Sequence, residues 1–152
     1  MPRGVSGKAL FMELTLNLRL PRDRMSVSVA RHVVRHAVQE LGVDDDCAHD
    51  IELALSEACT NVLLHSGPGE EYDVRVELAD ERCEIQVVDV GRGFDPERLP
   101  PPVVGPDAEW GRGLLIMTAL VDRLRFRVKP TSGTVVRMEK DVVYADRSLL
   151  SR

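Results

Sequence analysis

The sequence lacks an apolar run long enough to cross a bilayer, because no stretch of about 18 consecutive apolar residues occurs. The N-terminal MPRGVSGKALFM has two basic residues but no apolar core of signal-peptide length. We therefore expect a cytoplasmic protein without a membrane partner, and residues 1–11 as a disordered leader. The alternative is a start codon assigned too early, with Met12 as the true first residue.

Cysteine is scarce, with three residues at Cys47, Cys59 and Cys83. Their number is odd, and they show neither CxxC nor Cys/His spacing, which argues against a disulfide framework and a zinc site. Reduced thiols in the core are the simplest interpretation. This interpretation agrees with a cytoplasmic location.

An excess of positive charge is also missing, since 20 Lys and Arg face 25 Asp and Glu and the net charge is −5. Phosphate backbones favour basic surfaces, so we expect no direct nucleic-acid partner. Two arginine clusters, Arg31 with Arg35 and Arg123 to Arg127, are interpreted as solvated faces. The length of 152 residues and the 43% hydrophobic content suit one globular domain with a real core.

Hydrophobic periodicity predicts the elements, and no internal repeat or low-complexity linker interrupts them. Alternation predicts strands over 12–20, 72–79, 83–90, 123–129 and 134–140. Helical spacing predicts a helix ending at Gly42, a second from about Asp44 to Ser66, and a third carrying Leu114, Met117, Val121 and Leu124. The order β-α-α-β-β-loop-α-β-β predicts an α+β two-layer sandwich, with a mostly antiparallel sheet covered on one face by helices.

Two segments have no periodicity. Residues 91–110 hold five of the nine prolines, and a loop of this length in a compact domain is usually functional or disordered. Residues 142–152 are predicted to be a C-terminal tail.

The second predicted helix contains SEACTN, in which Glu57 and Asn61 lie four residues apart and so on one face. An amide oxygen can be a ligand for Mg²⁺, and a glutamate one turn away could accept a proton from an attacking hydroxyl or water. An ordinary polar helix face is the alternative.

The stretch DVGRGFD follows a strand in which Asp89 shares a face with Ile85 and Val87. A carboxylate at the edge of a core needs a partner there. Gly91 and Gly93 let the backbone approach a ligand closely. A strand end followed by a turn is the alternative.

The stretch GRGLLIM places Gly111 and Gly113 at the start of a predicted helix, where N–H groups and the helix dipole favour phosphate. A flexible hinge is the alternative. No GKS or GKT follows, which excludes a Walker A loop, and the pattern is too short for a dinucleotide fingerprint. In SGTVV, Thr134 is the first strand residue after a Ser-Gly turn.

These four motifs, in this order, resemble the nucleotide-binding signature of the GHKL ATPase superfamily, which includes gyrase, Hsp90, histidine kinases and MutL. The resemblance covers residues 12–141 and implies the GHKL (Bergerat) ATP-binding fold. The matching segments are Glu57 to Asn61, Asp89 to Gly93, Gly111 to Leu114, and Gly133 with Thr134. Residues 94–110 would be the ATP lid.

Within the superfamily the chain is similar to small bacterial anti-sigma serine kinases, whose runs read S-E-A-x-T-N and G-x-G-L-x-I-M. We expect neither a phosphoacceptor-histidine helix pair before the domain nor a transducer domain after it. The resemblance implies that Asp89 binds the adenine amino group and that Thr134 helps to hold the ring through water. Gly91 and Gly93 would leave space for the base and the lid.

The resemblance also implies how ATP or ADP and Mg²⁺ are held. Gly111 and Gly113, with Leu114 and the following helix, would cradle the phosphates, and Arg112 is placed to contact one. Asn61 would hold Mg²⁺, and Glu57 would be the general base toward a Ser or Thr hydroxyl.

Two functions follow as hypotheses. The first is an ATP-dependent serine/threonine kinase and anti-sigma factor, acting as a homodimer that sequesters a sigma factor and phosphorylates a STAS-domain partner. The second is a nucleotide-gated binding module without kinase activity, favoured by Trp110 beside the second glycine pair and by Pro100 to Pro102 in the lid. A plain α+β domain that binds no nucleotide would require four accidental matches.

Overall fold

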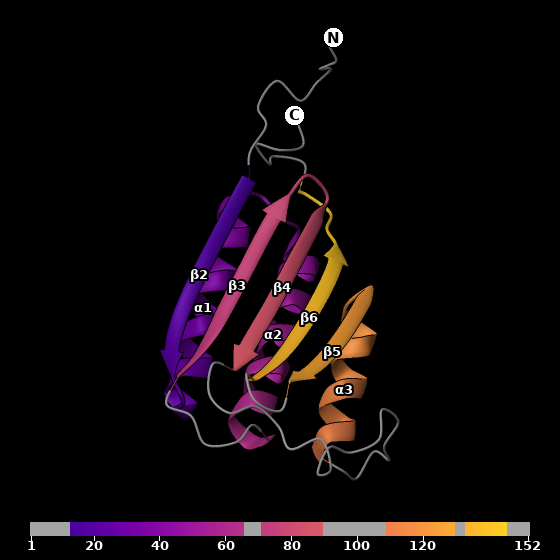
Figure 1. Ribbon diagram of the computed structural model, residues 1–152. Helices are drawn as coiled ribbons and strands as arrows, with labels where there is room; N and C mark the ends of the chain where they lie inside the picture. The colour runs from indigo at the N-terminus through magenta and orange to yellow at the C-terminus, as the bar shows by residue number, and fades with distance from the viewer. Residues whose placement is uncertain (1–12, 66–70, 90–108, 130–132, 146–152) are drawn as a thin grey trace.

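The computed structural model describes residues 13–65, 71–89, 109–129 and 133–145. Its sheet has five strands in the order β2-β3-β4-β6-β5, and each neighbouring pair is antiparallel. Figure 1 shows α1 and α2 behind this sheet and α3 beside β5. The predicted α+β sandwich is therefore confirmed. The strands are β2 Glu13–Pro21, β3 Glu71–Ala79, β4 Arg82–Asp89, β5 Arg123–Lys129 and β6 Gly133–Asp141, and the helices are α1 Arg24–Glu40, α2 Asp45–His65 and α3 Glu109–Leu120.

Local signals account for the limits of the first two helices. The Asp23 side chain caps α1 by accepting a hydrogen bond from the Met25 N–H at 2.9 Å. Beyond the end of α1, Gly42 takes a φ of 93°, a conformation that glycine adopts without strain. Asp44 accepts bonds from backbone N–H groups in the first turn of α2, where the helix dipole also favours acidic side chains.

The core lies between the sheet and the helices. The inward positions of β3 and β4 alternate with outward ones, so that every second side chain is buried. Cys59 and Cys83 are free thiols inside this core, and Cys47 is half-buried. Among the described residues, no helix combines the length and the hydropathy needed to span a bilayer.

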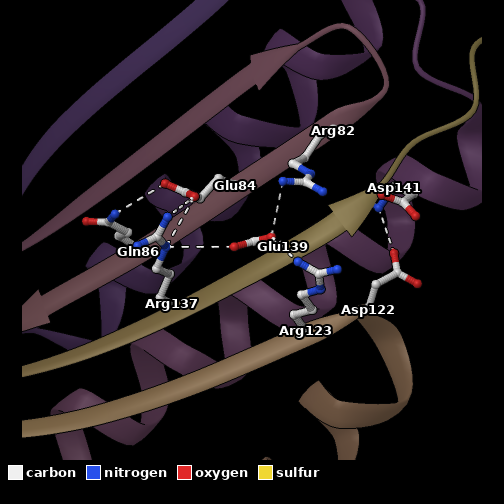
Figure 2. Close-up of polar contacts among 8 residues, drawn as sticks. All are labelled: Arg82, Glu84, Gln86, Asp122, Arg123, Arg137, Glu139 and Asp141. Atoms are coloured by element: carbon white, nitrogen blue, oxygen red, sulfur yellow. Dashed lines mark hydrogen bonds and ion pairs between the residues drawn. The ribbon is translucent and has the colours of Figure 1, made fainter.

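The outer face of the sheet carries a group of ion pairs, which Figure 2 shows. Glu139 is only 9% exposed, because arginine side chains surround it there. Its carboxylate lies 3.5 Å from Arg82, 3.7 Å from Arg123 and 4.0 Å from Arg137. Arg137 also pairs with Glu84 at 2.6 Å. Arg82, Arg123 and Arg137 therefore have acidic partners, and the interpretation of Arg123 as merely solvated was incomplete.

The third helix differs from its prediction at both ends. It begins at Glu109, two residues before Gly111, and it ends at Leu120. Val121 and Leu124, both counted in this helix, lie beyond its end, and Leu124 is in β5, the strand predicted over 123–129, opposite Met138 of β6. An acidic residue suits a helix N-terminus, and packing against α2 outweighs the low helix propensity of glycine.

The predicted C-terminal tail, residues 142–152, begins later than expected. Val142 is 5% exposed, and Tyr144 forms an antiparallel bridge with Val43. The Tyr144 hydroxyl also donates a hydrogen bond to the Asp80 carbonyl. These contacts fasten residues 142–145 to the end of the sandwich away from the predicted site, and the rest of the tail lies outside the described residues.

Candidate functional site

The predicted site residues that the structure describes lie at one end of the sandwich. Figure 1 shows the end of β4, the start of β6, the last turns of α2 and the start of α3 together at the lower edge. These elements carry Asp89, Thr134, Asn61 and Gly113. Elements distant in the sequence thus bring at least one described residue of each motif to one edge of the molecule.

In the site, α2 and α3 approach each other closely at Gly113. A Cβ atom added to Gly113 would lie 3.0 Å from Asn61 Oδ1, 3.2 Å from Asn61 Nδ2 and 3.3 Å from Glu57 Oε1. The carboxylate and the amide therefore lie side by side under the backbone of α3, as their spacing predicted. Only a residue without a side chain allows this approach without displacing its neighbours.

Asn61 and Glu57 differ in their surroundings. Asn61 is 4% exposed, and its Nδ2 finds no hydrogen-bond partner among the described residues. Such an orphaned amide is unusual in a folded protein and suits a group that binds a ligand. Glu57 is partly buried, and this burial raises the pKa of its carboxyl above the ordinary value.

The start of α3 assigns the two glycines different positions. The first four N–H groups of a helix have no acceptor within it, and in α3 these belong to Glu109, Trp110, Gly111 and Arg112. Gly111 thus keeps the position expected for phosphate binding, whereas Gly113 supplies the close approach to α2. Leu114 packs against the hydrophobic core.

Asp89 ends β4 and is fully buried. It shares the inward face with Ile85 and Val87, as predicted. In the sheet its register partners are Tyr72 on β3 and Thr134 on β6. Asp89 and Thr134 therefore occupy opposite register positions on neighbouring strands. Gly91 and Gly93 lie outside the described residues, as does most of the predicted lid.

A comparison with protein families gives the same assignment. The family described as "Histidine kinase-like ATPase domain" matches residues 20–140, which is most of the chain. The chain belongs to the histidine kinase-like ATPase family. This match confirms the resemblance on which the motif interpretation rested.

Two named relatives are similar to this histidine kinase-like ATPase domain over most of their own length. "Serine-protein kinase RsbW" of Halalkalibacterium halodurans is 32% identical over 135 residues, which are 83% of this chain and 82% of that protein. "Anti-sigma F factor" of Clostridium botulinum is 30% identical over 135 residues, which are 84% of this chain and 94% of that protein. A solved structure of the RsbU and RsbW domains of a Mycobacterium tuberculosis protein shares the fold, with a TM-score of 0.69 and 23% identity, and covers 90% of this chain and 34% of that one.

Sequence reasoning missed one charged residue of this histidine kinase-like ATPase domain. Arg22 follows the end of β2, and its side chain is 11% exposed. Its Nη1 lies 3.4 Å from Asp89 Oδ1, and its Nη2 donates to the Val62 carbonyl at 2.9 Å. An arginine after a strand-ending proline has no periodicity, so only the folded structure reveals this contact.

Proposed function

We propose that the chain is an ATP-dependent serine/threonine-protein kinase that acts as an anti-sigma factor. One observation carries the proposal: the Glu57 carboxylate and the Asn61 amide meet beneath Gly113, at the end of the sandwich where Asp89 is buried. Relatives named as a serine-protein kinase and as an anti-sigma factor support the same conclusion.

In the proposed complex, ATP lies along the lower edge of the sandwich. Asp89 accepts a hydrogen bond from the adenine amino group, with Thr134 beside it on β6. The N–H groups at the start of α3, including those of Gly111 and Arg112, face the phosphates. Gly91 and Gly93 remain predicted neighbours of the base.

Mg²⁺ fits the residues present, because the Asn61 amide is nearly buried and its oxygen is a hard ligand. Within the described part of the chain no group of three His, Cys, Asp or Glu side chains could hold a metal ion. Asn61 would therefore contribute one ligand, and the nucleotide phosphates and water would contribute the others. When bound, the ion would neutralise charge on the phosphates.

Glu57 is placed to act as the general base. The hydroxyl oxygen of a protein Ser or Thr bonds to the γ-phosphorus while the bond from that phosphorus to the leaving ADP oxygen breaks, and the hydroxyl proton passes to the Glu57 carboxylate. A raised pKa makes this carboxylate a better proton acceptor than an ordinary glutamate. The remaining rate enhancement comes from orienting the two substrates.

The partners follow from the proposed activity. The phosphoacceptor would be a STAS-domain anti-anti-sigma protein, and the sequestered protein a sigma factor, both cytoplasmic. A homodimer is also proposed. Its two candidate surfaces are the edge strand β2 and the part of α1 that exposes Met25, Val29 and Val33. Sedimentation equilibrium measures the oligomeric state.

The test is phosphate transfer from radiolabelled ATP to a panel of STAS-domain proteins from the same genome, with Glu57→Gln beside the wild type. We expect transfer to one STAS protein, and a loss of at least about a hundredfold in the variant, because a general base contributes about 10² to 10⁴ in rate. ADP binding should persist in Glu57→Gln, since the amide keeps the shape of the carboxyl.

The Glu57→Gln variant should also fold at least as well as the wild type. Because the pKa of Glu57 is raised in the folded protein, the folded state binds the proton more tightly, and stability falls as pH rises through that range. At neutral pH the neutral amide avoids this cost. Glu77→Gln, on the exposed outer face of the sheet, is the matched control and should transfer phosphate normally. Nucleotide binding without transfer by the wild type would reject the kinase and favour the nucleotide-gated module.

A further inference from the structure

Arg22 lies between three elements of the site end. It occupies the connection between β2 and α1, one residue after Pro21 and one before the N-cap Asp23. Its Nη2 donates hydrogen bonds to the Val62 carbonyl at 2.9 Å and to the Leu63 carbonyl at 3.4 Å. These carbonyls belong to the last turns of α2, where a positive charge is favoured by the helix dipole.

The same guanidinium reaches the end of β4. Its Nη1 lies 3.4 Å from Asp89 Oδ1, and the two side chains are 11% and 0% exposed. Tyr72, the register partner of Asp89, lies within electrostatic reach as well: burial raises the pKa of its phenol, and Arg22 opposes that rise. A fully buried carboxylate is costly unless a charged or hydrogen-bonding partner accompanies it, and Arg22 is such a partner.

The position of Arg22 along α2 links the two halves of the site. The carbonyls that it binds follow directly after Asn61, so Arg22 restrains the turn that carries the amide as well as the carboxylate of Asp89. A planar guanidinium with five N–H donors can engage both groups at once, and a lysine ammonium on a flexible stem cannot do so in the same geometry. A carboxylate has about four acceptor positions, so an ion pair with Arg22 leaves capacity for the adenine amino group.

We propose that Arg22 is a positioning residue of the nucleotide site, which holds the Asp89 carboxylate in place for the adenine amino group and ties it to the turn that carries Asn61. This inference rests on the proposed function, because it assigns a role toward the same nucleotide. Arg22 acts through Asp89, so its removal should reduce discrimination for the 6-amino group and not only overall stability.

The experiment measures the affinities of ADP and IDP, in Mg²⁺, by calorimetry. IDP carries an oxygen where ADP carries the amino group, so the ratio of affinities reports recognition by Asp89. We expect the wild type to prefer ADP and Arg22→Met to lower the ratio by about tenfold, the value of one hydrogen bond to a charged group. Arg22→Lys, which keeps the charge without the fork, should give an intermediate ratio.

The matched control is Arg19→Met on neighbouring β2, because Arg19 is 65% exposed and pairs with Asp73 on the outer face. It should leave the ratio unchanged. As a second measurement, urea unfolding of Arg22→Met, Asp89→Asn and the double variant should give non-additive effects, since the two groups are in contact.

The outcomes separate the two proposals. If the wild type prefers ADP but Arg22→Met and Arg22→Lys keep its ratio, the inference about Arg22 is overturned and the proposed function stands. Additive unfolding effects would overturn the inference in the same way. If the wild type binds neither ADP nor IDP, the proposed function fails and the inference fails with it.

Discussion

Gly113 matters at the scale of single residues because of the side chain that it lacks. Glycine inside a helix usually lowers stability by about 1 kcal/mol relative to alanine, so its position in the second turn of α3 requires a reason. The reason is the close approach of the helix backbone to Glu57 and Asn61, which leaves too little room for a methyl group at residue 113. Site geometry and helix propensity therefore make opposite demands at this residue.

We predict that Gly113→Ala binds Mg²⁺ and ADP less tightly while its stability changes little. The new methyl group would lie 3.0 Å from Asn61 Oδ1 and 3.2 Å from Nδ2, so the amide must shift by a few tenths of an ångström. Improved helix propensity offsets part of the strain, by about 1 kcal/mol. Thermal unfolding and calorimetry with ADP, each with and without Mg²⁺, measure the two effects.

Leu115→Ala is the control for this substitution, because Leu115 is 55% exposed on the same helix. It should bind nucleotide like the wild type. If Gly113→Ala bound Mg²⁺ and ADP as tightly as the wild type, the contact between α3 and Asn61 would have no part in the site.

At the scale of elements, alternation and helical spacing predicted which segments form strands and helices, and they placed Asp89 on the inward face of β4. They did not predict where α3 begins, because packing of Gly113 against α2 outweighs the tendency of glycine to end a helix. They also counted Leu124 both in the third helix and in the strand over 123–129, since its apolar spacing fits both, and it lies in that strand, β5.

The contacts between elements distant in the sequence could not be predicted from local sequence patterns. That Asp89 and Asn61 serve one nucleotide could be inferred only from the family resemblance of the four motifs. Local periodicity does not indicate which elements meet. Arg22 is the clearest case, because its partners lie 40 or more residues away and its own surroundings in the sequence look like a simple connection.

The outer face of the sheet gives a prediction at this scale. Glu139→Gln should lower the free energy of unfolding by about 1 kcal/mol, because three guanidiniums would then face one another with less compensating charge. The loss should be no larger, because these arginines are 41% to 62% exposed and water screens their charges. Urea unfolding at low and high salt measures the loss, which should shrink in salt.

Glu77→Gln provides the comparison on the same face, since Glu77 is 41% exposed and pairs with Arg75 at 3.4 Å. Its effect should stay below about 0.5 kcal/mol. Equal losses in the two variants would mean that the cluster around Glu139 adds nothing beyond an ordinary surface ion pair.

At the scale of the whole molecule, the two ends of the sandwich are held differently. Away from the site, Tyr144 and Val142 fasten the C-terminal segment to the turn between β3 and β4 and to the connection between α1 and α2. At the site end, α2 carries the Asn61 amide and the Glu57 carboxylate against Gly113 of α3, and β4 ends at the buried Asp89. A nucleotide bound there would contact α2, α3 and β4 at once and so add contacts between these elements.

The final prediction is therefore that ADP with Mg²⁺ raises the unfolding temperature of the whole domain. A ligand present at about 100 times its Kd stabilises the folded state by about 2.7 kcal/mol, which corresponds to about 5 to 10 °C for a domain of this size. Scanning calorimetry measures the shift.

Two variants check this prediction. Glu57→Gln should keep the shift in unfolding temperature, because Glu57 acts as the general base on the transferred proton and not on the bound ADP. Asp89→Asn should lose most of it, because the amide presents a donor as well as an acceptor to the adenine amino group. A shift of the same size in Asp89→Asn would mean that adenine binds away from Asp89. If millimolar ADP with Mg²⁺ did not raise the unfolding temperature of the wild type, the nucleotide site itself would be contradicted.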